Sequence, residues 1–199
     1  MKKSHANAPV DRRSLRTRTA LRDALIDLIA ERGWDDIAVQ DICARANIGR
    51  STFYLHYANK DALLQGGLKD LQTELQRQAR VRSDNACPNT KVPESFHFAL
   101  GLIEHAHEQR KVFRSLIGRR SGYVVQQRFR EMVIRLITAE LPAAARTYPR
   151  GAVARWLAGA IVELMSWWIE QRTPLPPQEL AALFNELSRP ALAQRRLTS

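Results

Sequence analysis

Apolar residues recur with a helical period along most of the chain. Leucine and isoleucine occupy positions 21, 25, 28 and 29, the i, i+4, i+7, i+8 spacing of one face of an amphipathic helix. We expect this helix to end at Gly33, because glycine adopts the left-handed conformation that follows a helix without a steric penalty. No alternating pattern typical of strands occurs in the sequence. The predicted fold class is therefore all-α.

Two shorter apolar stripes follow, and a tight turn is expected between them. The turn is Asn47-Ile48-Gly49, in which asparagine is the non-glycine residue best suited to a positive φ. Two short helices joined by a three-residue turn form a helix-turn-helix, whose second helix can enter the major groove of DNA. The motif is expected over about residues 38–57. The apolar residues on which this rests are Val39, Ile42, Cys43, Ala46, Phe53, Tyr54 and Tyr57.

The rest of the chain continues the helical pattern, giving about nine helices in total. Asn59 is a good N-cap for a fourth helix that runs to about residue 82. Later helices are expected at about 94–109, 111–118, 122–141, 150–172 and 177–188. The predicted domains are a disordered basic arm (1–13), a helix-turn-helix head (14–62) and a helical ligand-binding and dimerisation body (63–199).

Charge points to a polyanionic partner. The chain of 199 residues is 45% hydrophobic, enough for a core, and carries 31 Lys+Arg against 20 Asp+Glu, a net charge of +11. Residues 1–22 hold seven Lys/Arg against Asp11 alone, and residues 109–135 hold eight against Glu131 alone. A basic arm beside a folded head favours nucleic acid, because Lys and Arg release counterions from phosphates. A short solvated tail without function is the alternative, so charge alone does not decide.

Other classes of protein lack support. The richest apolar stretch, 156–169, is interrupted by polar residues, and no apolar run follows the charged N-terminus. We therefore expect no membrane span, no secretory signal and a cytoplasmic location. No nucleophile–base pair, glycine-rich phosphate loop or paired carboxylates stand out, so an enzyme is not expected.

Cysteine and histidine do not predict a metal or cofactor. Cys43 and Cys87 form no Cys-x-x-Cys pattern and are expected to be reduced thiols, Cys43 in the core and Cys87 an inert loop thiol or an oxidant sensor. His97 and His105 lie two turns apart, but Gly101 stands at the i+4 position between them.

Residues 15–65 resemble the N-terminal domain of the TetR family of bacterial transcriptional regulators. The matching segments are Glu31-Arg32-Gly33-Trp34, the run from Val39 to Tyr57 (VQDICARANIGRSTFYLHY) and Asn59-Lys60-Asp61-Ala62-Leu63-Leu64. Ala38, Asn47 and Gly49 depart from the Thr, Gly and Ser that are frequent in the family, which weakens two helix caps. Leu116–Arg120 and the Trp167–Glu170 and Pro174–Pro176 segments are similar to a subgroup related to the dihydroxyacetone kinase activator.

The resemblance and the expected helix faces together suggest which side chains contact DNA. Arg50 is suited to a bidentate contact with guanine O6 and N7, and Gln40 to an adjacent base. Lys60 lies at the start of a helix, where the dipole attracts phosphate. Each residue taken singly could instead be an ordinary surface or packing residue, and the arm a solubilising tail. The full expected set is Gln40, Arg50, Ser51, Thr52, Tyr54, His56, Lys60, Arg18 and Thr17.

The body is expected to hold an effector and a second copy of the chain. Aromatic residues near the middle and end of the chain are candidates for a ligand cavity or for ordinary core: Phe98, His105, Tyr123, Trp156 and Trp167. The helix at 150–172 is apolar on two sides, so one side is assigned to its own core and the other to a dimer. The interface set is Val162, Met165, Ile169, Leu180, Leu183, Phe184 and Leu187.

Gly66 and Gly67 interrupt the fourth helix. They are interpreted either as a hinge or as a close approach by a neighbouring helix.

The function expected is that of a ligand-responsive regulator of transcription, a repressor that binds a palindromic operator as a homodimer and is released by a small molecule. The alternative is a co-regulator or activator that works through a protein partner bound to the body. Effector, operator and regulated genes are not specified by the sequence.

Overall fold

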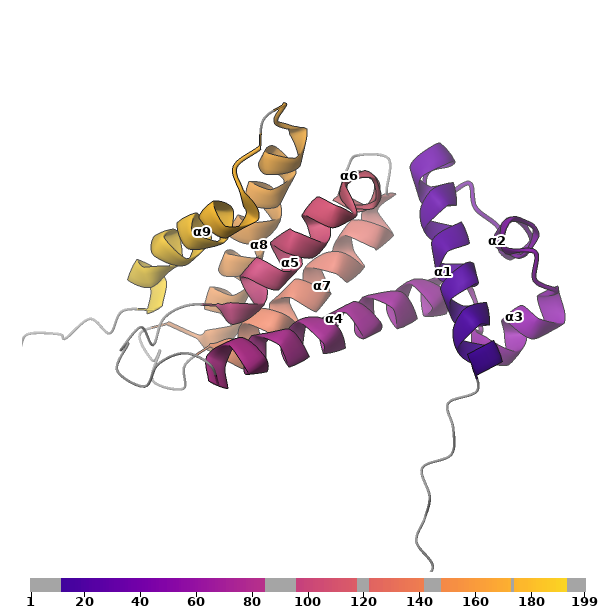
Figure 1. The fold of residues 1–199 in the computed structure, drawn as a ribbon, viewed down its shortest axis with the longest axis horizontal. Coiled ribbons are helices and arrows are strands. Elements are labelled where there is room, and N and C mark those ends of the chain that lie inside the picture. Colours follow the sequence, from indigo (N-terminus) through magenta and orange to yellow (C-terminus); the bar gives the residue numbers. More distant parts are fainter. Residues whose placement is uncertain (1–11, 85–95, 118–121, 142–147, 173, 193–199) are drawn as a thin grey trace, which may run out of the picture.

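The structure, a computed structural model, describes residues 12–84, 96–117, 122–141, 148–172 and 174–192. Within these ranges it contains nine α-helices and no strand, so the all-α prediction is confirmed. Helices α1–α3 form a head at one end of the molecule, and α4–α9 form the body (Figure 1). The helices are α1 (Arg12–Arg32), α2 (Val39–Ala46), α3 (Arg50–His56), α4 (Lys60–Asp84), α5 (His97–Glu108), α6 (Arg110–Ile117), α7 (Gly122–Glu140), α8 (Arg150–Glu170) and α9 (Pro177–Leu192).

Two helix ends differ from the expected ones. Helix α1 begins at Arg12, so Arg12 and Arg13 are helical instead of belonging to the arm, and residues 1–11 lie outside the described residues. Helix α9 continues to Leu192 with Pro190 inside it, four residues beyond the expected end. Neither difference alters the order of the helices.

The turns of the head have the predicted backbone. Gly33 has φ 82° and Asn47 has φ 53°, the left-handed conformations expected after α1 and α2. Gly49 is extended (φ −65°, ψ 147°) where it caps α3. The Asn59 side chain accepts the Ala62 N–H at 2.8 Å, as its N-cap role requires.

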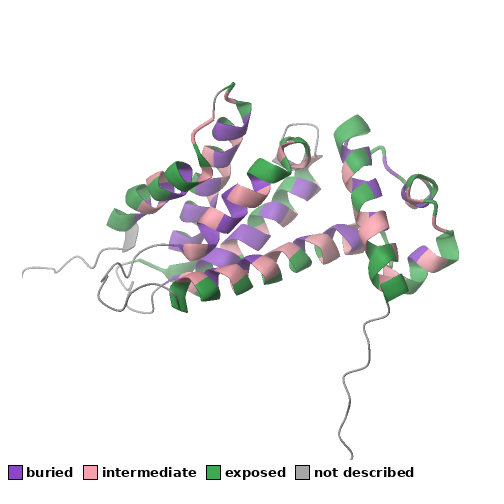
Figure 2. Ribbon diagram, viewed as in Figure 1, coloured by how far each residue is buried: buried purple, intermediate pink, exposed green. Residues whose placement is uncertain are grey.

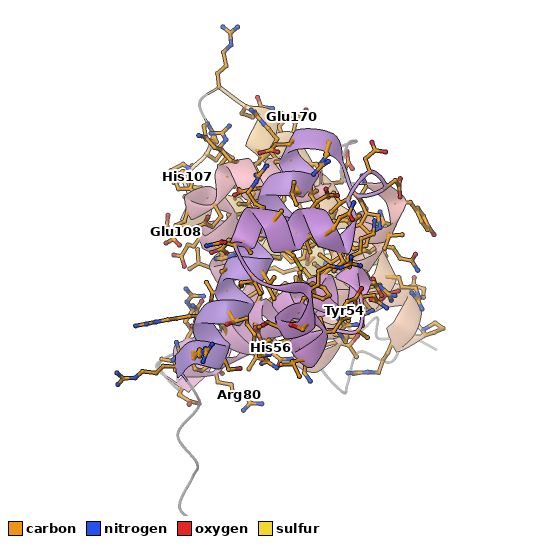
Figure 3. All side chains as sticks on the ribbon, turned by 90° about the vertical axis from the view of Figure 1, so that its right-hand side faces the viewer. Tyr54, His56, Arg80, His107, Glu108 and Glu170 are labelled. Atoms are coloured by element: carbon orange, nitrogen blue, oxygen red, sulfur yellow. The ribbon has the colours of Figure 1, made fainter. Side chains whose placement is uncertain are left out.

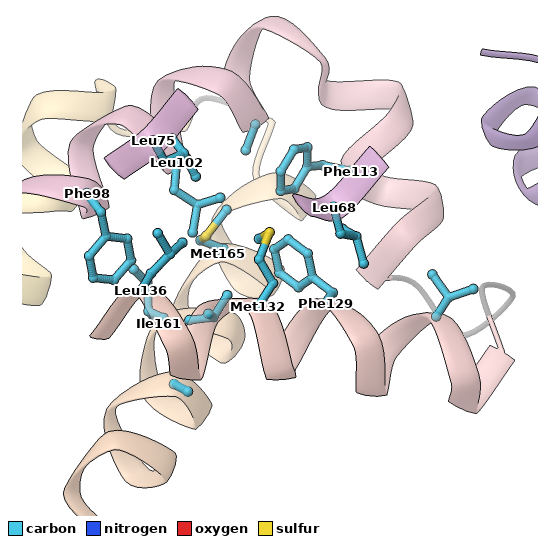
Figure 4. Packing of buried hydrophobic residues seen from close by; sticks show 14 of the residues in the cluster. Leu68, Leu75, Phe98, Leu102, Phe113, Phe129, Met132, Leu136, Ile161 and Met165 are labelled. Atoms are coloured by element: carbon cyan, nitrogen blue, oxygen red, sulfur yellow. The ribbon is translucent and has the colours of Figure 1, made fainter. Parts of the chain in front are cut away.

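Helix α4 links the two parts of the molecule because it contributes to the hydrophobic core in both of them. Leu63 and Leu64 lie near its head end, whereas Leu75 and Ala79 pack farther along, within the body. In the body, the rings of Phe113 (α6) and Phe129 (α7) meet edge to face with centroids 5.6 Å apart (Figure 4). The buried sides of the helices face one another throughout (Figure 2).

Helix α8 is a core helix of the body. It has 21 residues, and an 18-residue stretch of it has mean hydropathy 1.2, which is long and apolar enough to cross a membrane by length and composition. Its buried residues nevertheless form one side that packs in the core beside α7, including Leu157, Ile161 and Met165. At its C-terminus, Arg110 of α6 donates to the Ile169 and Gln171 carbonyl oxygens, each at 2.6 Å. These contacts satisfy carbonyls that the end of a helix leaves without partners.

Glu140 at the end of α7 caps the start of α5. Its carboxylate oxygens accept the backbone N–H groups of His97 (2.6 Å) and Phe98 (3.1 Å). Burial raises the pKa of this carboxyl to about 7, against the effect of the two hydrogen bonds. The cap fixes α5 against α7.

One cap of the recognition motif is incomplete, and restoring it is expected to stabilise the protein. Asp41 accepts the Ala38 N–H at 2.8 Å, but alanine has no side-chain oxygen to return the interaction. We expect Ala38→Thr to raise the free energy of unfolding by about 1 kcal/mol. Urea unfolding measures it, with Ala38→Val as the control of similar shape; equal gains in both variants would contradict the capping explanation.

Candidate DNA-binding surface

Helix α3 presents a largely exposed outer face. Tyr54 is 52% exposed and Leu55 is 82% exposed, whereas Phe53 between Ile42 and the rest of the head core is fully buried. Arg50 and Ser51 are exposed, and Thr52 and His56 are half-buried. Seen from the head end, Tyr54 and His56 lie on the face turned toward the viewer (Figure 3). The buried ring of Phe53 thus holds α3 with its polar side chains turned outward.

Leu55 is the residue that sequence reasoning did not include in this face. Leu55 has 82% of its surface exposed on the same short helix as the exposed polar residues. The feature of the sequence that could have identified Leu55 is its position directly after Tyr54 on a short helix. An apolar side chain on such a face can contact the methyl group of thymine.

The first turns of α1 lie beside the end of α3. The Arg18 guanidinium stands over the Tyr57 ring, 6.0 Å from its centroid. Burial raises the pKa of the Tyr57 hydroxyl, which therefore remains neutral. Thr17 is half-buried next to Arg18, and Gln40 is exposed in the first turn of α2. Three helices therefore bring predicted DNA-contacting residues to the head.

An ion pair fixes α2 against α1. Arg45 donates two hydrogen bonds to the Glu31 carboxylate, at 2.8 and 2.6 Å. The same hydrogen bonding lowers the pKa of Glu31. Because both side chains are exposed, this bidentate pair adds little to the free energy of folding, and its main effect is on the orientation of the two helices. It orients α2 relative to the long helix of the head.

Lys60 is held inside the protein. Its ammonium donates to the carbonyl oxygens of Trp34 and Ile37, both at 2.8 Å, and stands 4.6 Å from the centroid of the Trp34 ring. Two of its three N–H donors are used in this way. A phosphate contact, as predicted, stays a prediction for the third donor. The structural role was missed because the two carbonyls lie 23 and 26 residues away in the sequence.

Trp34 also meets the body. Gly122, at the start of α7, has φ 79°, and a Cβ there would lie 3.2 Å from the Trp34 Cβ. Nearby, Arg128 of α7 donates to both oxygens of Asp61, at 3.2 and 3.0 Å. These contacts join the start of α4 and the loop after α1 to α7.

Close packing against neighbouring side chains explains the two glycines of α4. A Cβ at Gly66 would lie 3.1 Å from Tyr57 Cε1, and one at Gly67 would lie 3.0 Å from Arg22 Cδ. The close-approach explanation therefore accounts for both residues. The hinge stays a prediction.

The structure does not gather the five residues predicted to line a ligand cavity. Phe98 is buried in the core, and Tyr123 is 77% exposed. Trp156 (58% exposed) and Trp167 (47% exposed) lie on the outside of α8. Only His105 of the five lines the largest hollow described, of about 600 Å³, between α1, α4, α5 and α6. Trp156 and Trp167 line a smaller apolar hollow on the outside of α8 and α9, and a ligand site at these residues stays a prediction.

Four of the seven residues predicted for the dimer interface are buried within the chain, and the interface itself stays a prediction. Met165, Ile169, Leu180 and Phe184 are buried against their own chain. Val162 and Leu183 are half-buried, and Leu187 is exposed. The outer face of α8 and α9 instead holds an apolar hollow of about 350 Å³. Its described lining residues are Trp156, Ala160, Glu163, Leu164, Trp167, Phe184, Leu187 and Ser188.

The thiols and histidines behave as ordinary residues where they are described. Cys43 is buried in the head, and burial raises the pKa of its thiol. Cys87 lies outside the described residues. No group of three or more His, Cys, Asp or Glu that could hold a metal ion occurs in the described part of the chain.

Comparison with known proteins agrees with this architecture. Residues 21–66 match the family described as bacterial regulatory proteins, tetR family, and residues 94–190 match a transcriptional regulator C-terminal region. The chain belongs to the TetR family. Proteins of this family are DNA-binding transcription factors and not enzymes.

Individual relatives span most of the chain. YxbF, an HTH-type transcriptional regulator of Bacillus subtilis (strain 168), is 28% identical over 180 residues, 88% of this chain and 45% of YxbF. This chain therefore spans less than half the length of that relative. A TetR regulator from Streptococcus agalactiae 2603V is 26% identical, with TM-score 0.62 over 92% of this chain and 99% of its own.

A second structure, the dihydroxyacetone kinase operon activator DhaS, is 17% identical with TM-score 0.55 over 88% of this chain and 96% of its own. At that identity the likeness concerns the fold alone. It leaves the predicted subgroup as a proposal.

The Lys60 contacts predict a loss of stability on substitution. We expect Lys60→Met to lower the free energy of unfolding by about 1–3 kcal/mol, because two carbonyl oxygens lose a charged donor. Urea unfolding tests this, with Lys69→Met on the exposed side of the same helix as control. A Lys60→Met protein as stable as the control variant would refute the structural role.

Proposed function

We propose that this TetR-family protein is a cytoplasmic, ligand-responsive repressor that binds a palindromic operator as a homodimer. The observation that supports it most is the outer face of α3, where Arg50, Ser51 and Tyr54 are exposed around a buried Phe53. A short helix with exposed polar side chains, preceded by a three-residue turn, suits entry into the major groove. The basic α1 beside it suits the flanking phosphates.

The proposed dimer uses the outer face of α8 and α9. Trp156, Trp167 and Leu187 are exposed there around an apolar hollow, and large exposed apolar patches mark interaction surfaces. A two-fold axis through this face would place two heads on one side of the dimer. Half-sites about 34–36 Å apart, or another whole number of helical turns, would then be read together.

Release by a small molecule is proposed as a shift between two head spacings. The effector must bind the spacing that does not fit the operator more tightly than the one that does. A coupling of about 1–3 kcal/mol would change operator affinity by about 5- to 150-fold.

An activator that works through a protein partner on the body is the second candidate. The observation that favours it is the same exposed face of α8 and α9, which a partner could cover in place of a second copy. Recovery of a stable one-to-one complex with another protein, together with a monomeric free chain, would support it.

The reading role of Arg50 gives the first test. Genomic DNA bound by the purified protein is sequenced, and the recovered site is titrated with wild type and Arg50→Ala. We expect the variant to lose about 1–3 kcal/mol at one base-pair position, because it lacks the bidentate donor. Arg80→Ala, an exposed arginine of α4 far along the body, should match wild type. An unchanged base preference in Arg50→Ala would refute this reading.

The dimer face gives the second test. Trp156→Glu/Trp167→Glu is expected to place charge in the apolar hollow and yield a monomer of 22.7 kDa, against twice that mass for wild type. Light scattering after size exclusion measures the mass. Tyr123→Glu, which changes an exposed aromatic residue of α7, is the control and should remain dimeric. Equal dimerisation of all three proteins would exclude this face.

A further inference from the structure

We propose that the hollow between α1, α4, α5 and α6 is the effector site, and that its ligand is an organic cation with an apolar body. The inference rests on the proposed ligand-responsive function and gives it a site and a ligand class. The volume of about 600 Å³ falls in the range of small-molecule pockets. Every wall of the hollow comes from a described helix.

The inner wall is apolar. Leu25 of α1, Leu64 and Leu68 of α4 and Phe113 of α6 line it and are buried, and the half-buried Leu71 and Val112 stand nearer the opening. Contact with these side chains would remove the apolar surface of a ligand from water, which drives binding of such molecules. A small inorganic ion would gain nothing from this wall.

The charged side chains that line the hollow favour a positively charged ligand. Asp23, Asp27, Asp70 and Glu74 line the hollow, against Arg22 as the one described arginine or lysine. Hydrogen bonds from Arg77 and Gln78 lower the pKa of Glu74 to about 2, so this carboxylate is ionised, and its charge is paired with that of Arg77. The four carboxylates still outnumber Arg22 and Arg77 together, so the hollow is net negative in a chain of net charge +11. Its field attracts cations at a place where the rest of the protein repels them.

The remaining titratable group does not reverse this balance. His105 is half-buried at the wall, and burial lowers its pKa, which keeps the ring neutral at neutral pH. Its ring meets Phe113 edge to face, with centroids 5.8 Å apart. His105 therefore adds aromatic surface and no positive charge.

Arg22 is the residue that a bound cation would displace. Its guanidinium lies 3.6 Å from an Asp70 oxygen, and its stem lies against Gly67, whose missing side chain makes room for it. A ligand cation can take the place of this guanidinium beside Asp70. Arg22 stands one turn after Arg18, which lies over Tyr57 at the end of α3. Occupation of the hollow would thus act directly on the helix that carries the head.

The other hollows fit this role less well. The hollow of about 590 Å³ between α4 and α7 is lined by Lys69, Arg128 and Arg135, and the two arginines already donate to Asp61, Glu131 and Gln72. The hollow on α8 and α9 contains no described residue of the head. Of these hollows, all lined by residues that the structure describes, the proposed site is the one that includes residues of α1.

Two dyes of similar shape and opposite charge provide the test. Rhodamine 6G is a cationic xanthene and fluorescein an anionic one, and each is titrated with the full chain by fluorescence anisotropy. The net charge of the protein favours fluorescein, so we expect the reverse preference, at least tenfold for rhodamine 6G, only if the acidic hollow binds it. Equal binding, or a preference for fluorescein, would overturn the proposal.

Substitutions locate the binding. Asp23→Asn/Asp27→Asn should weaken rhodamine 6G about 5- to 20-fold, because each partly exposed charge pair is worth about 2- to 5-fold. Asp35→Asn/Asp36→Asn, with the same charge change on exposed head residues outside the hollow, should differ less than twofold from wild type. Leu71→Trp should fill the opening and reduce binding at least tenfold. Circular dichroism verifies folding. Unchanged binding in both hollow variants would place the dye elsewhere and overturn the site.

Release from the operator tests the effector role of the hollow separately from the proposed function on which this inference rests. If a palindrome is bound, saturating rhodamine 6G should weaken binding to it at least fivefold in wild type and less than twofold in Leu71→Trp. A dye that occupies the hollow without changing operator affinity would overturn its role as effector site. Failure of the protein to bind any specific DNA sequence would instead refute the proposed function, while the dye preference would still report on the hollow.

Discussion

The structure depends on one helix that carries a single hydrophobic core from the head into the body. Helix α4 buries Leu63 and Leu64 at its head end and Leu75 and Ala79 farther along the body, so neither part can pack without it. The contacts at its start reinforce this connection: Lys60 binds the loop after α1, and Asp61 pairs with Arg128 of α7. A helix that is packed in one continuous core at both ends cannot move at one end alone. The head and body are therefore mechanically connected.

Local chemistry explains which parts of the fold were predictable. Gly33 and Asn47 terminate helices because of their own backbone preferences, so their positive φ angles could be read from the sequence. The exposure of Arg50, Ser51 and Tyr54 on α3 agrees with the helix face expected from the motif, and their contact with DNA stays a prediction. The Lys60 contacts could not be predicted, because they join atoms 23 and 26 residues apart and depend on how the loop after α1 folds back.

The faces of α8 show the limit of a periodicity argument. Two apolar stripes at the same spacing are equally consistent with core and with interface. Packing beside α7 buries members of both stripes, among them Leu157, Ile161, Met165 and Ile169, and leaves Trp156 and Trp167 outside. The two stripes therefore do not separate into a core side and an interface side. The five residues predicted to line a ligand cavity are dispersed for a related reason. Residue type alone does not determine where a hollow forms, because its position depends on how helices such as α1 and α4 pack near Gly67.

Because α4 is long, a small rotation of its far end in the body would produce a larger displacement at the head. Its 25 residues make a rod of about 37 Å, at about 1.5 Å per residue. A tilt of about 5° at the far end of such a rod would carry the near end through about 3 Å, roughly the rise of one base pair along a strand of DNA. In a two-fold assembly the two displacements would be opposed, so the mismatch with a rigid duplex would double. Because the phosphates of a rigid duplex have a fixed spacing, a modest rotation of α4 would be enough to move the heads out of register with the two half-sites.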